Sequence, residues 1–187
     1  MGNKSWFKVR PNPDANKWVK GTENLIALIQ QAKVHPDIKR ISLNYLIWSI
    51  GDAHFLLDGG KKYHQVKKGK LQKEEMSAKY CSFKAGELLK KEKGKGCRRD
   101  HIYGRNWVID KLIEEDREVF RNIEEYTSVC VVTEHEHTCL TNIEKKLRVK
   151  DEAIGWDKYA EYTKTNKEFK ILDRESGKEK SLVKNGL

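Results

Sequence analysis

Two short clusters in the C-terminal half of the chain combine potential metal ligands with a potential proton acceptor. The first is Asp100-His101, and the second is the Glu-His-Glu-His run at residues 134–137. A carboxylate oxygen and an imidazole nitrogen suit a divalent ion that keeps water ligands, such as Mg²⁺ or Mn²⁺, with Zn²⁺ also possible. If the chain folds back between the clusters, they can share one ion.

Neighbouring residues on an extended segment point to opposite sides, so Asp100 and His101 are expected to do different work. We expect Asp100 and His137 to be the metal ligands and His101 to accept a proton from a water molecule. A cation that stabilises a leaving alkoxide, together with an imidazole base on the attacking side, supports one-metal hydrolysis of a phosphodiester. Two simpler readings remain open: a surface turn at residues 100–101, and a charged first turn of a helix at residues 134–137.

The elements around the second cluster can be read from residue type. Residues 127–133 form a short run in which most side chains are β-branched, which predicts a strand. Thr133 then predicts the N-cap of a helix from 134 to about 148, with Glu136 at the reciprocal position of a capping box. Residues 107–121 form an amphipathic pattern and predict a helix inserted between the two clusters. That insertion decides whether the clusters meet or are held apart.

With these residues in view, the stretch 96–142 resembles the HNH endonucleases, also called ββα-metal nucleases. Asp100-His101-Ile102 is similar to the D-H-I opening of the family. Residues 133–140 are similar to the closing T-x-x-E-H-x-x-L pattern of many phage-type members. The long interval that contains residues 107–121 departs from compact members, as does the absence of paired zinc-binding cysteines.

The resemblance implies a role for several residues. It implies that Asp100 and His137 bind the metal, that His101 is the general base and that Asn122 orients that base. His135 competes with His137 as a ligand, and Asn106 competes with Asn122. The cations that would hold the scissile or a neighbouring phosphate are Arg98, Arg99 and Arg105.

Composition favours a polyanionic partner. The chain of 187 residues carries 38 Lys and Arg against 28 Asp and Glu, a formal net charge of +10. Cations that neutralise phosphates release condensed counterions, so duplex DNA is the expected partner. Lys93 and Lys95 lie in a basic, glycine-containing loop that either contacts phosphate or is a solvated linker. In the plainer reading, the lysines only keep the protein in solution.

The four cysteines, at positions 81, 97, 130 and 139, contain no C-x-x-C pair. Together with the lack of a signal-peptide pattern and of a long apolar run, this predicts reduced thiols, no membrane span and a cytoplasmic location, which is the host cytoplasm if the protein is viral. A structural zinc protein using Cys97, His101 and Cys139 is a further class to test.

The expected fold is α+β, mostly helical, with a small ββα-metal (HNH-like) module in the C-terminal half. Residues 1–95 are expected to form a basic, largely helical nucleic-acid-binding region. Residues 96–172 are expected to form the module with its inserted helix, and residues 173–187 a disordered basic tail. The leading functional hypothesis is a metal-dependent DNA endonuclease. The alternative is a non-catalytic basic protein that binds nucleic acid or inhibits a host enzyme.

Overall fold

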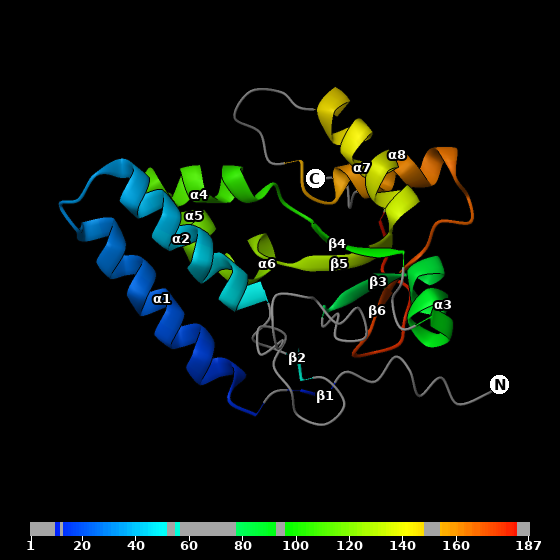
Figure 1. Ribbon diagram of the computed structural model, residues 1–187, viewed down its shortest axis with the longest axis horizontal. Helices are drawn as coiled ribbons and strands as arrows, with labels where there is room; N and C mark the ends of the chain where they lie inside the picture. The colour runs from blue at the N-terminus through cyan, green and yellow to red at the C-terminus, as the bar shows by residue number, and fades with distance from the viewer. Residues whose placement is uncertain are drawn as a thin grey trace.

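The computed structural model describes residues 10–11, 13–51, 55–56, 78–92, 96–147 and 154–182. Within them the fold is α+β, mostly helical with one small sheet, which confirms the predicted fold class (Figure 1). Lys93 and Lys95 of the predicted basic loop lie outside the described residues, as do the last five residues of the predicted tail.

A four-stranded sheet in the order β4-β5-β3-β6 positions the first cluster. Its strands are β3 (Tyr80–Ser82), β4 (Cys97–His101), β5 (Val129–Thr133) and β6 (Ile171–Asp173). β4 runs antiparallel to β5, with Asp100 opposite Cys130, whereas β3 runs parallel to β5. The sheet therefore crosses the boundary predicted at residues 95 and 96, because β3 precedes that boundary and pairs with strands that follow it.

The two faces of β5 bury different cores, as the two-residue period of a strand requires. Cys130 and Val132 pack with α7 (Glu134–Leu147) and α8 (Asp157–Thr165). Val129 and Val131 pack with α3 (Phe83–Glu92). Because β5 is buried on both faces and paired on both edges, it is the rigid centre on which β4 and α7 are held.

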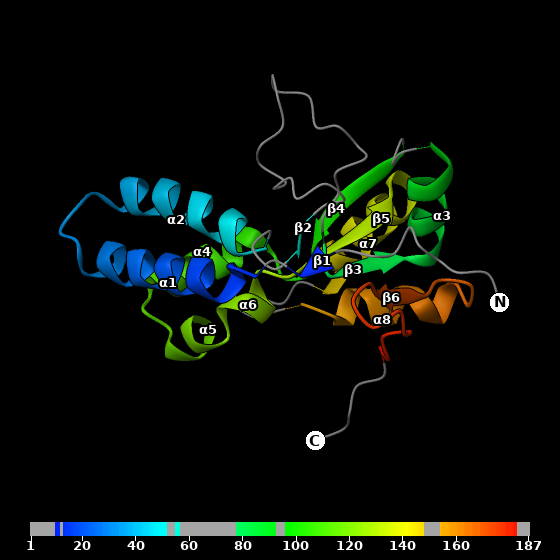
Figure 2. The same ribbon diagram turned by 90° about the horizontal axis from the view of Figure 1, so that it is seen from below.

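The segment between β4 and β5 forms α4 (Arg105–Ile113), α5 (Arg117–Arg121) and α6 (Ile123–Tyr126). These helices pack on α1 (Ala15–Gln31) and α2 (Pro36–Gly51), on the side of the molecule away from α3 and α8 (Figure 2). Their shared core consists of Val19, Ile26, Leu43, Ile47, Ile50, Val108, Ile109, Leu112, Val119 and Ile123. The inserted segment therefore buries its apolar face against the N-terminal helices and leaves β4 and β5 free to pair.

The prediction of a single helix at residues 107–121 is wrong, since the helix is interrupted at residues 114–116. Glu115 has a positive φ of 59°, which no residue of a right-handed helix adopts. The Asp116 carboxylate then accepts from the backbone N–H groups of Glu118 and Val119 and begins α5 as its N-cap. Asp116 lies inside the amphipathic pattern, where periodicity alone does not mark it as a cap.

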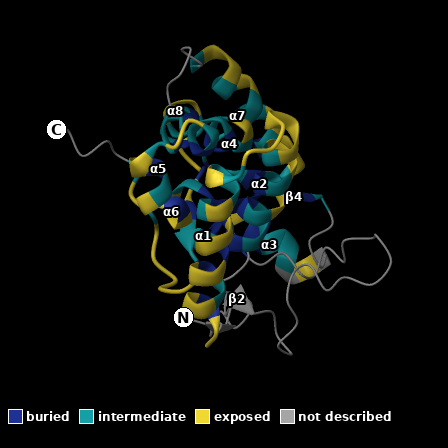
Figure 3. Ribbon diagram, turned by 90° about the vertical axis from the view of Figure 1, so that its left-hand side faces the viewer, coloured by how far each residue is buried: buried dark blue, intermediate teal, exposed yellow. Residues whose placement is uncertain are grey.

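Two hydrogen bonds dock the inserted segment on the N-terminal helices. Gln30 Nε2 donates to the Leu112 carbonyl at 2.7 Å, and Arg40 of α2 pairs with Asp110 of α4. The outward sides of α1 and α5 are exposed, and the inward side of α1 is buried (Figure 3). The core of this group of helices therefore lies on the side of α1 that faces α2 and α4.

The tail expected to be disordered from residue 173 is ordered through residue 182, which corrects that prediction. β6 ends at Asp173, and the buried Arg174 donates to the Ala78 carbonyl at 3.2 Å. Burial and a backbone partner hold Arg174, although its polar sequence neighbourhood resembles a solvated tail.

A second, two-stranded sheet pairs β1 (Arg10–Pro11) with β2 (Phe55–Leu56).

Candidate metal-binding site

The N-terminus of α7 is held by the capping box that the sequence predicts. Thr133 Oγ1 accepts from the Glu136 N–H at 3.1 Å, and Glu136 Oε2 accepts from the Thr133 N–H at 2.8 Å. Glu136 Oε2 also accepts from Ser82 Oγ of β3 at 2.6 Å, and Glu136 is only 2% exposed. These hydrogen bonds attach the first turn of α7 to β5 and to β3. His137 is the next residue of the helix, so its position is held by the same contacts.

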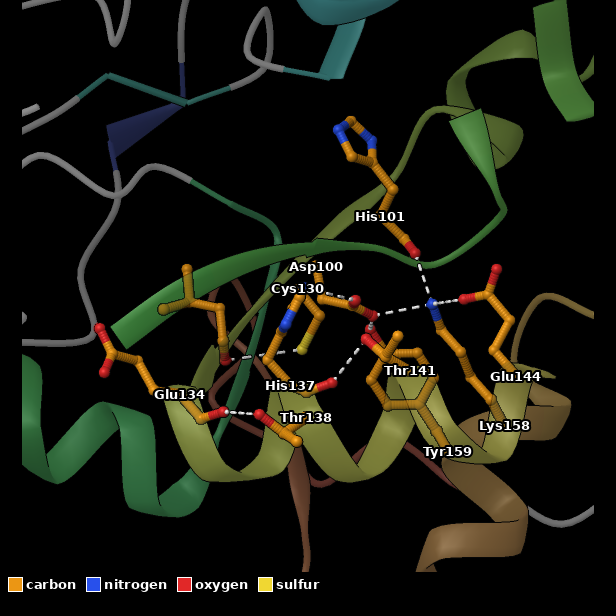
Figure 4. A network of polar contacts seen from close by, with 11 residues as sticks. Asp100, His101, Cys130, Glu134, His137, Thr138, Thr141, Glu144, Lys158 and Tyr159 are labelled. Carbon is orange, nitrogen blue, oxygen red and sulfur yellow. Dashed lines mark hydrogen bonds and ion pairs between the residues drawn. The ribbon is translucent and has the colours of Figure 1, made fainter. Parts of the chain in front are cut away.

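Asp100 and His137 face each other across the gap between β4 and α7 (Figure 4). Asp100 Oδ1 lies 3.6 Å from His137 Nε2. The Asp100 side chain is 8% exposed and the His137 side chain 40% exposed, so one side of the pair is open to solvent. The two clusters do meet, because the inserted helices fold away from the strands that carry them.

The other oxygen of Asp100 has different partners, both on α8. Tyr159 donates its hydroxyl hydrogen to Oδ2, and Lys158 Nζ lies 2.9 Å from the same oxygen. Burial, with the nearby Asp100 charge as a further cause, raises the pKa of Tyr159 well above its usual value. Tyr159 therefore remains a hydrogen-bond donor, and Asp100 has one oxygen held by α8 and one that faces His137.

Lys158 and Tyr159 were missed by the reading of the sequence. They lie in the first turn of α8, where an isolated lysine among polar residues is usually a solvent-facing residue. Residues 155–159 are weakly similar to a tail of some phage-type HNH members, but that likeness predicts no role for Lys158 or Tyr159, and the sequence distance from Asp100 gives no sign of contact. Only the packing of α8 on α7 brings them to the site.

His101 lies on the opposite side of β4, as the alternation of strand side chains predicts. Its ring meets the Trp48 ring of α2 edge-on, with centroids 5.1 Å apart. The Arg99 and Arg105 guanidinium carbons lie 5.2 and 5.7 Å from the centre of the same Trp48 ring. The residues of this Trp48 cluster are Trp48, Arg99, His101 and Arg105.

The environment of His101 keeps its imidazole neutral. Burial, together with the smaller effects of the charges of Arg99, Arg105 and Lys158, lowers its pKa from 6.5 to about 3. Its Nε2 atom is buried and has no hydrogen-bond partner among the described residues. The ring therefore has an available acceptor nitrogen when it is in the matching tautomer, but its basicity is low.

Asn122 does not orient His101 in the described structure, which corrects that expectation. It is exposed between α5 and α6, and its side-chain amide donates to the Glu118 carbonyl at 3.1 Å. Its competitor, Asn106, is exposed in the first turn of α4. Within the part of the chain that the structure describes, the Trp48 ring packs edge-on against His101, whereas both asparagines lie at the surface.

The remaining candidates separate clearly. His135 is exposed and its Nε2 lies 3.7 Å from Cys139 Sγ, so His137 is the histidine that meets Asp100. Arg98 is exposed and pairs with Glu134 at 3.3 Å. Cys97 packs on the α3 face of the sheet and Cys139 against the core on the α7 face, so the zinc set of Cys97, His101 and Cys139 is not assembled.

The donor set fits a hydrated ion better than a closed site. Two ligands of one ion at about 2.1 Å, at right angles to each other, lie about 3 Å apart, which is close to the observed 3.6 Å between Asp100 Oδ1 and His137 Nε2. No group of three or more His, Cys, Asp or Glu side chains that could hold a metal exists in the described parts of the chain. Mg²⁺ and Mn²⁺, which retain several waters, suit such a two-ligand set.

Comparison of the chain with models of protein families, with curated proteins and with solved structures finds no match. Among the described helices, none has the length and apolar character needed to cross a membrane.

Proposed function

We propose that this protein is a metal-dependent endonuclease that hydrolyses DNA phosphodiester bonds, as HNH-type nucleases do. The observation that carries the proposal is the approach of Asp100 Oδ1 to His137 Nε2, 3.6 Å apart, within a β4–β5–α7 unit. Two antiparallel strands followed by a helix, with one ligand on the first strand and one on the helix, is the arrangement expected from the sequence resemblance. Asp100 and His137 would hold one Mg²⁺ or Mn²⁺ ion.

When bound, such an ion stabilises negative charge on the leaving oxygen. The chain itself supplies the proton acceptor, His101, whose imidazole is neutral at physiological pH because its pKa is about 3. A phosphate that pairs with Arg99 and Arg105 offsets two of the charges that lower this pKa. Substrate binding would thus raise the His101 pKa, while burial, the largest cause of its low value, would still act.

The Trp48 cluster is the phosphate-binding surface in this proposal. Arg99 and Arg105 both lie against the Trp48 ring, which limits their conformations before substrate arrives. Guanidinium groups bind phosphate oxygens through paired N–H donors, and ordering them in advance lowers the entropic cost of binding. Asn122 has no part in the mechanism, and Arg98 is a peripheral contact.

A specific observation favours a second function, namely non-catalytic binding of nucleic acid. Lys158 already neutralises Asp100 at 2.9 Å, and the His101 ring is largely buried against Trp48. A chain with net charge +10 binds a polyanion without any metal chemistry. In that case Asp100 and Lys158 are a structural ion pair, and the arginines of the Trp48 cluster only hold phosphate.

One assay separates these functions. Supercoiled plasmid is incubated with the protein and Mg²⁺, Mn²⁺ or EDTA, and nicked and linear products are followed on a gel. We expect cleavage with either ion, none with EDTA, and a loss of about 100-fold or more in His101→Ala and His137→Ala. His135→Ala is the matched control from the same turn of α7 and should cut normally. If the protein binds DNA but cleaves it with neither Mg²⁺ nor Mn²⁺, the second function would be established.

A further inference from the structure

We propose that Lys158 is the resident counter-ion of the metal site, so that the negative charge of the site is partly neutralised, the site is folded without metal, and it binds a divalent ion weakly and exchangeably. This inference rests on the proposed metal site at Asp100 and His137. It concerns how that site is regulated, and it does not require that the protein cleave DNA.

Lys158 is a buried cation with three polar partners at the site. Its side chain is 2% exposed, and its ammonium lies 2.9 Å from Asp100 Oδ2 and 3.1 Å from Glu144 Oε2. It also donates to the backbone carbonyl of His101 at 2.8 Å (Figure 4). The ammonium therefore makes two hydrogen bonds, to Glu144 and to the His101 carbonyl, and an ion pair with Asp100.

These contacts tie together the parts of the site that come from distant elements. Glu144 is two turns beyond His137 on α7, Asp100 and His101 end β4, and Lys158 lies in the first turn of α8. One ammonium therefore fixes the spacing between the strand and the helix that carry the two expected ligands. It does so through Oδ2 and leaves Oδ1 of Asp100 directed at His137.

The charges in the Asp100–Lys158–Glu144 cluster set how strongly a cation is attracted. Two carboxylates and one ammonium leave a single negative charge in excess. The affinity of an oxygen-rich site for a divalent ion increases with the number of charged ligands. Lys158 therefore lowers the affinity of Asp100 for metal, and it also offsets the penalty of burying the Asp100 carboxylate when no metal is bound.

Two quantities should consequently move in opposite directions when the ammonium is removed. Lys158→Met keeps an unbranched side chain that is one atom shorter and deletes its charge. We expect the Mn²⁺ dissociation constant, measured by calorimetry, to fall on the order of tenfold or more. In EDTA the same variant should unfold at a lower temperature than the wild-type protein, and Mn²⁺ should restore most of the difference. A purely structural lysine would lower stability without strengthening metal binding.

Two further variants complete the test. Lys164→Met removes an exposed lysine of the same helix, which pairs with Glu161, and should change neither quantity. Glu144→Gln removes one negative charge from the cluster while Asp100 and Lys158 stay in place, so Mn²⁺ binding should weaken several-fold. If Lys158→Met does not fold in either condition, the direction of the Glu144→Gln effect decides the question.

The outcomes also distinguish this inference from the proposed nuclease activity. Unchanged or weaker Mn²⁺ binding in folded Lys158→Met, or unchanged or tighter binding in Glu144→Gln, overturns the counter-ion role. Tighter binding in Lys158→Met with no plasmid cleavage by the wild-type protein supports the counter-ion role and rejects the nuclease. Absence of Mn²⁺ binding in both the wild-type protein and Lys158→Met rejects both.

Discussion

Replacement of His101 by phenylalanine should flatten the acid side of the stability profile. Phenylalanine keeps an aromatic edge against Trp48 but has no proton to gain. In the wild-type protein the His101 pKa is about 3 when folded, against 6.5 for an unperturbed imidazole. Because the folded-state pKa is the lower one, the unfolded chain binds the proton first, and acid favours unfolding. The stability is fully present above pH 6.5 and is lost as the pH falls toward 3.

The magnitude follows from linkage. At pH 5 the unfolded chain holds the His101 proton and the folded chain does not, so this residue lowers the free energy of unfolding by about 2 kcal/mol relative to pH 8. Below pH 5 the loss continues at about 1.4 kcal/mol per pH unit until the folded-state pKa is reached. His101→Phe should remove this dependence. At pH 8 the variant should be at least as stable as the wild-type protein, since it deletes a buried nitrogen without a partner among the described residues.

Urea unfolding followed by tryptophan fluorescence at pH 8, 6.5 and 5 measures the effect. The quantity compared is the difference in unfolding free energy between the wild-type protein and His101→Phe at each pH, so that titrations elsewhere in the chain cancel. His35→Phe, which removes an imidazole that is 69% exposed, separates the buried position from the mere loss of a histidine. Parallel pH profiles for the wild-type protein and His101→Phe would refute the buried, neutral state of His101.

Three other changes test the surroundings of the site. Glu136→Ala removes the acceptor for the Thr133 N–H and for Ser82 Oγ and should cost about 1–3 kcal/mol in urea unfolding, whereas alanine at the exposed Glu134 should cost less than about 1 kcal/mol. Tyr159→Phe leaves Oδ2 of Asp100 with Lys158 alone and should lower the midpoint of thermal unfolding without abolishing folding; an unchanged midpoint would contradict the hydrogen bond. Ile109→Ala empties part of the core shared by the inserted segment and α2 and should cost about 2–5 kcal/mol in urea unfolding; a cost near zero would mean that the insertion is not docked there.

The affinity for DNA should depend strongly on salt concentration, as expected from the positive net charge of the chain. We expect the dissociation constant for a short duplex, measured by fluorescence anisotropy, to rise steeply with salt, because each phosphate contact releases counterions. Arg99→Gln and Arg105→Gln should each reduce the slope of the logarithm of affinity against the logarithm of salt by about one. Unchanged slopes would place the phosphate contacts elsewhere than the Trp48 cluster.

Local features of the site were readable from the sequence because they depend on neighbours in the chain. The capping box at Thr133 and Glu136, the strand before it and the opposite directions of Asp100 and His101 all follow from spacing within a few residues. The β-branched run that became β5 and the mixed helical and strand pattern of the whole chain belong to the same class. Each is determined by backbone geometry and side-chain type, so no distant contact was needed to predict them.

Tertiary structure decided the rest, because it depends on which surfaces pack together. The pairing of β4 with β5 across the inserted helices brought Asp100 to His137, and the core formed with α1 and α2 took the insertion out of the way. Asn122 lies at the surface because the insertion packs against α1 and α2 through its other residues. Lys158 and Tyr159 became partners of Asp100 only because α8 packs on α7. The sequence determined which chemical groups were available, and long-range packing decided which of them share one site.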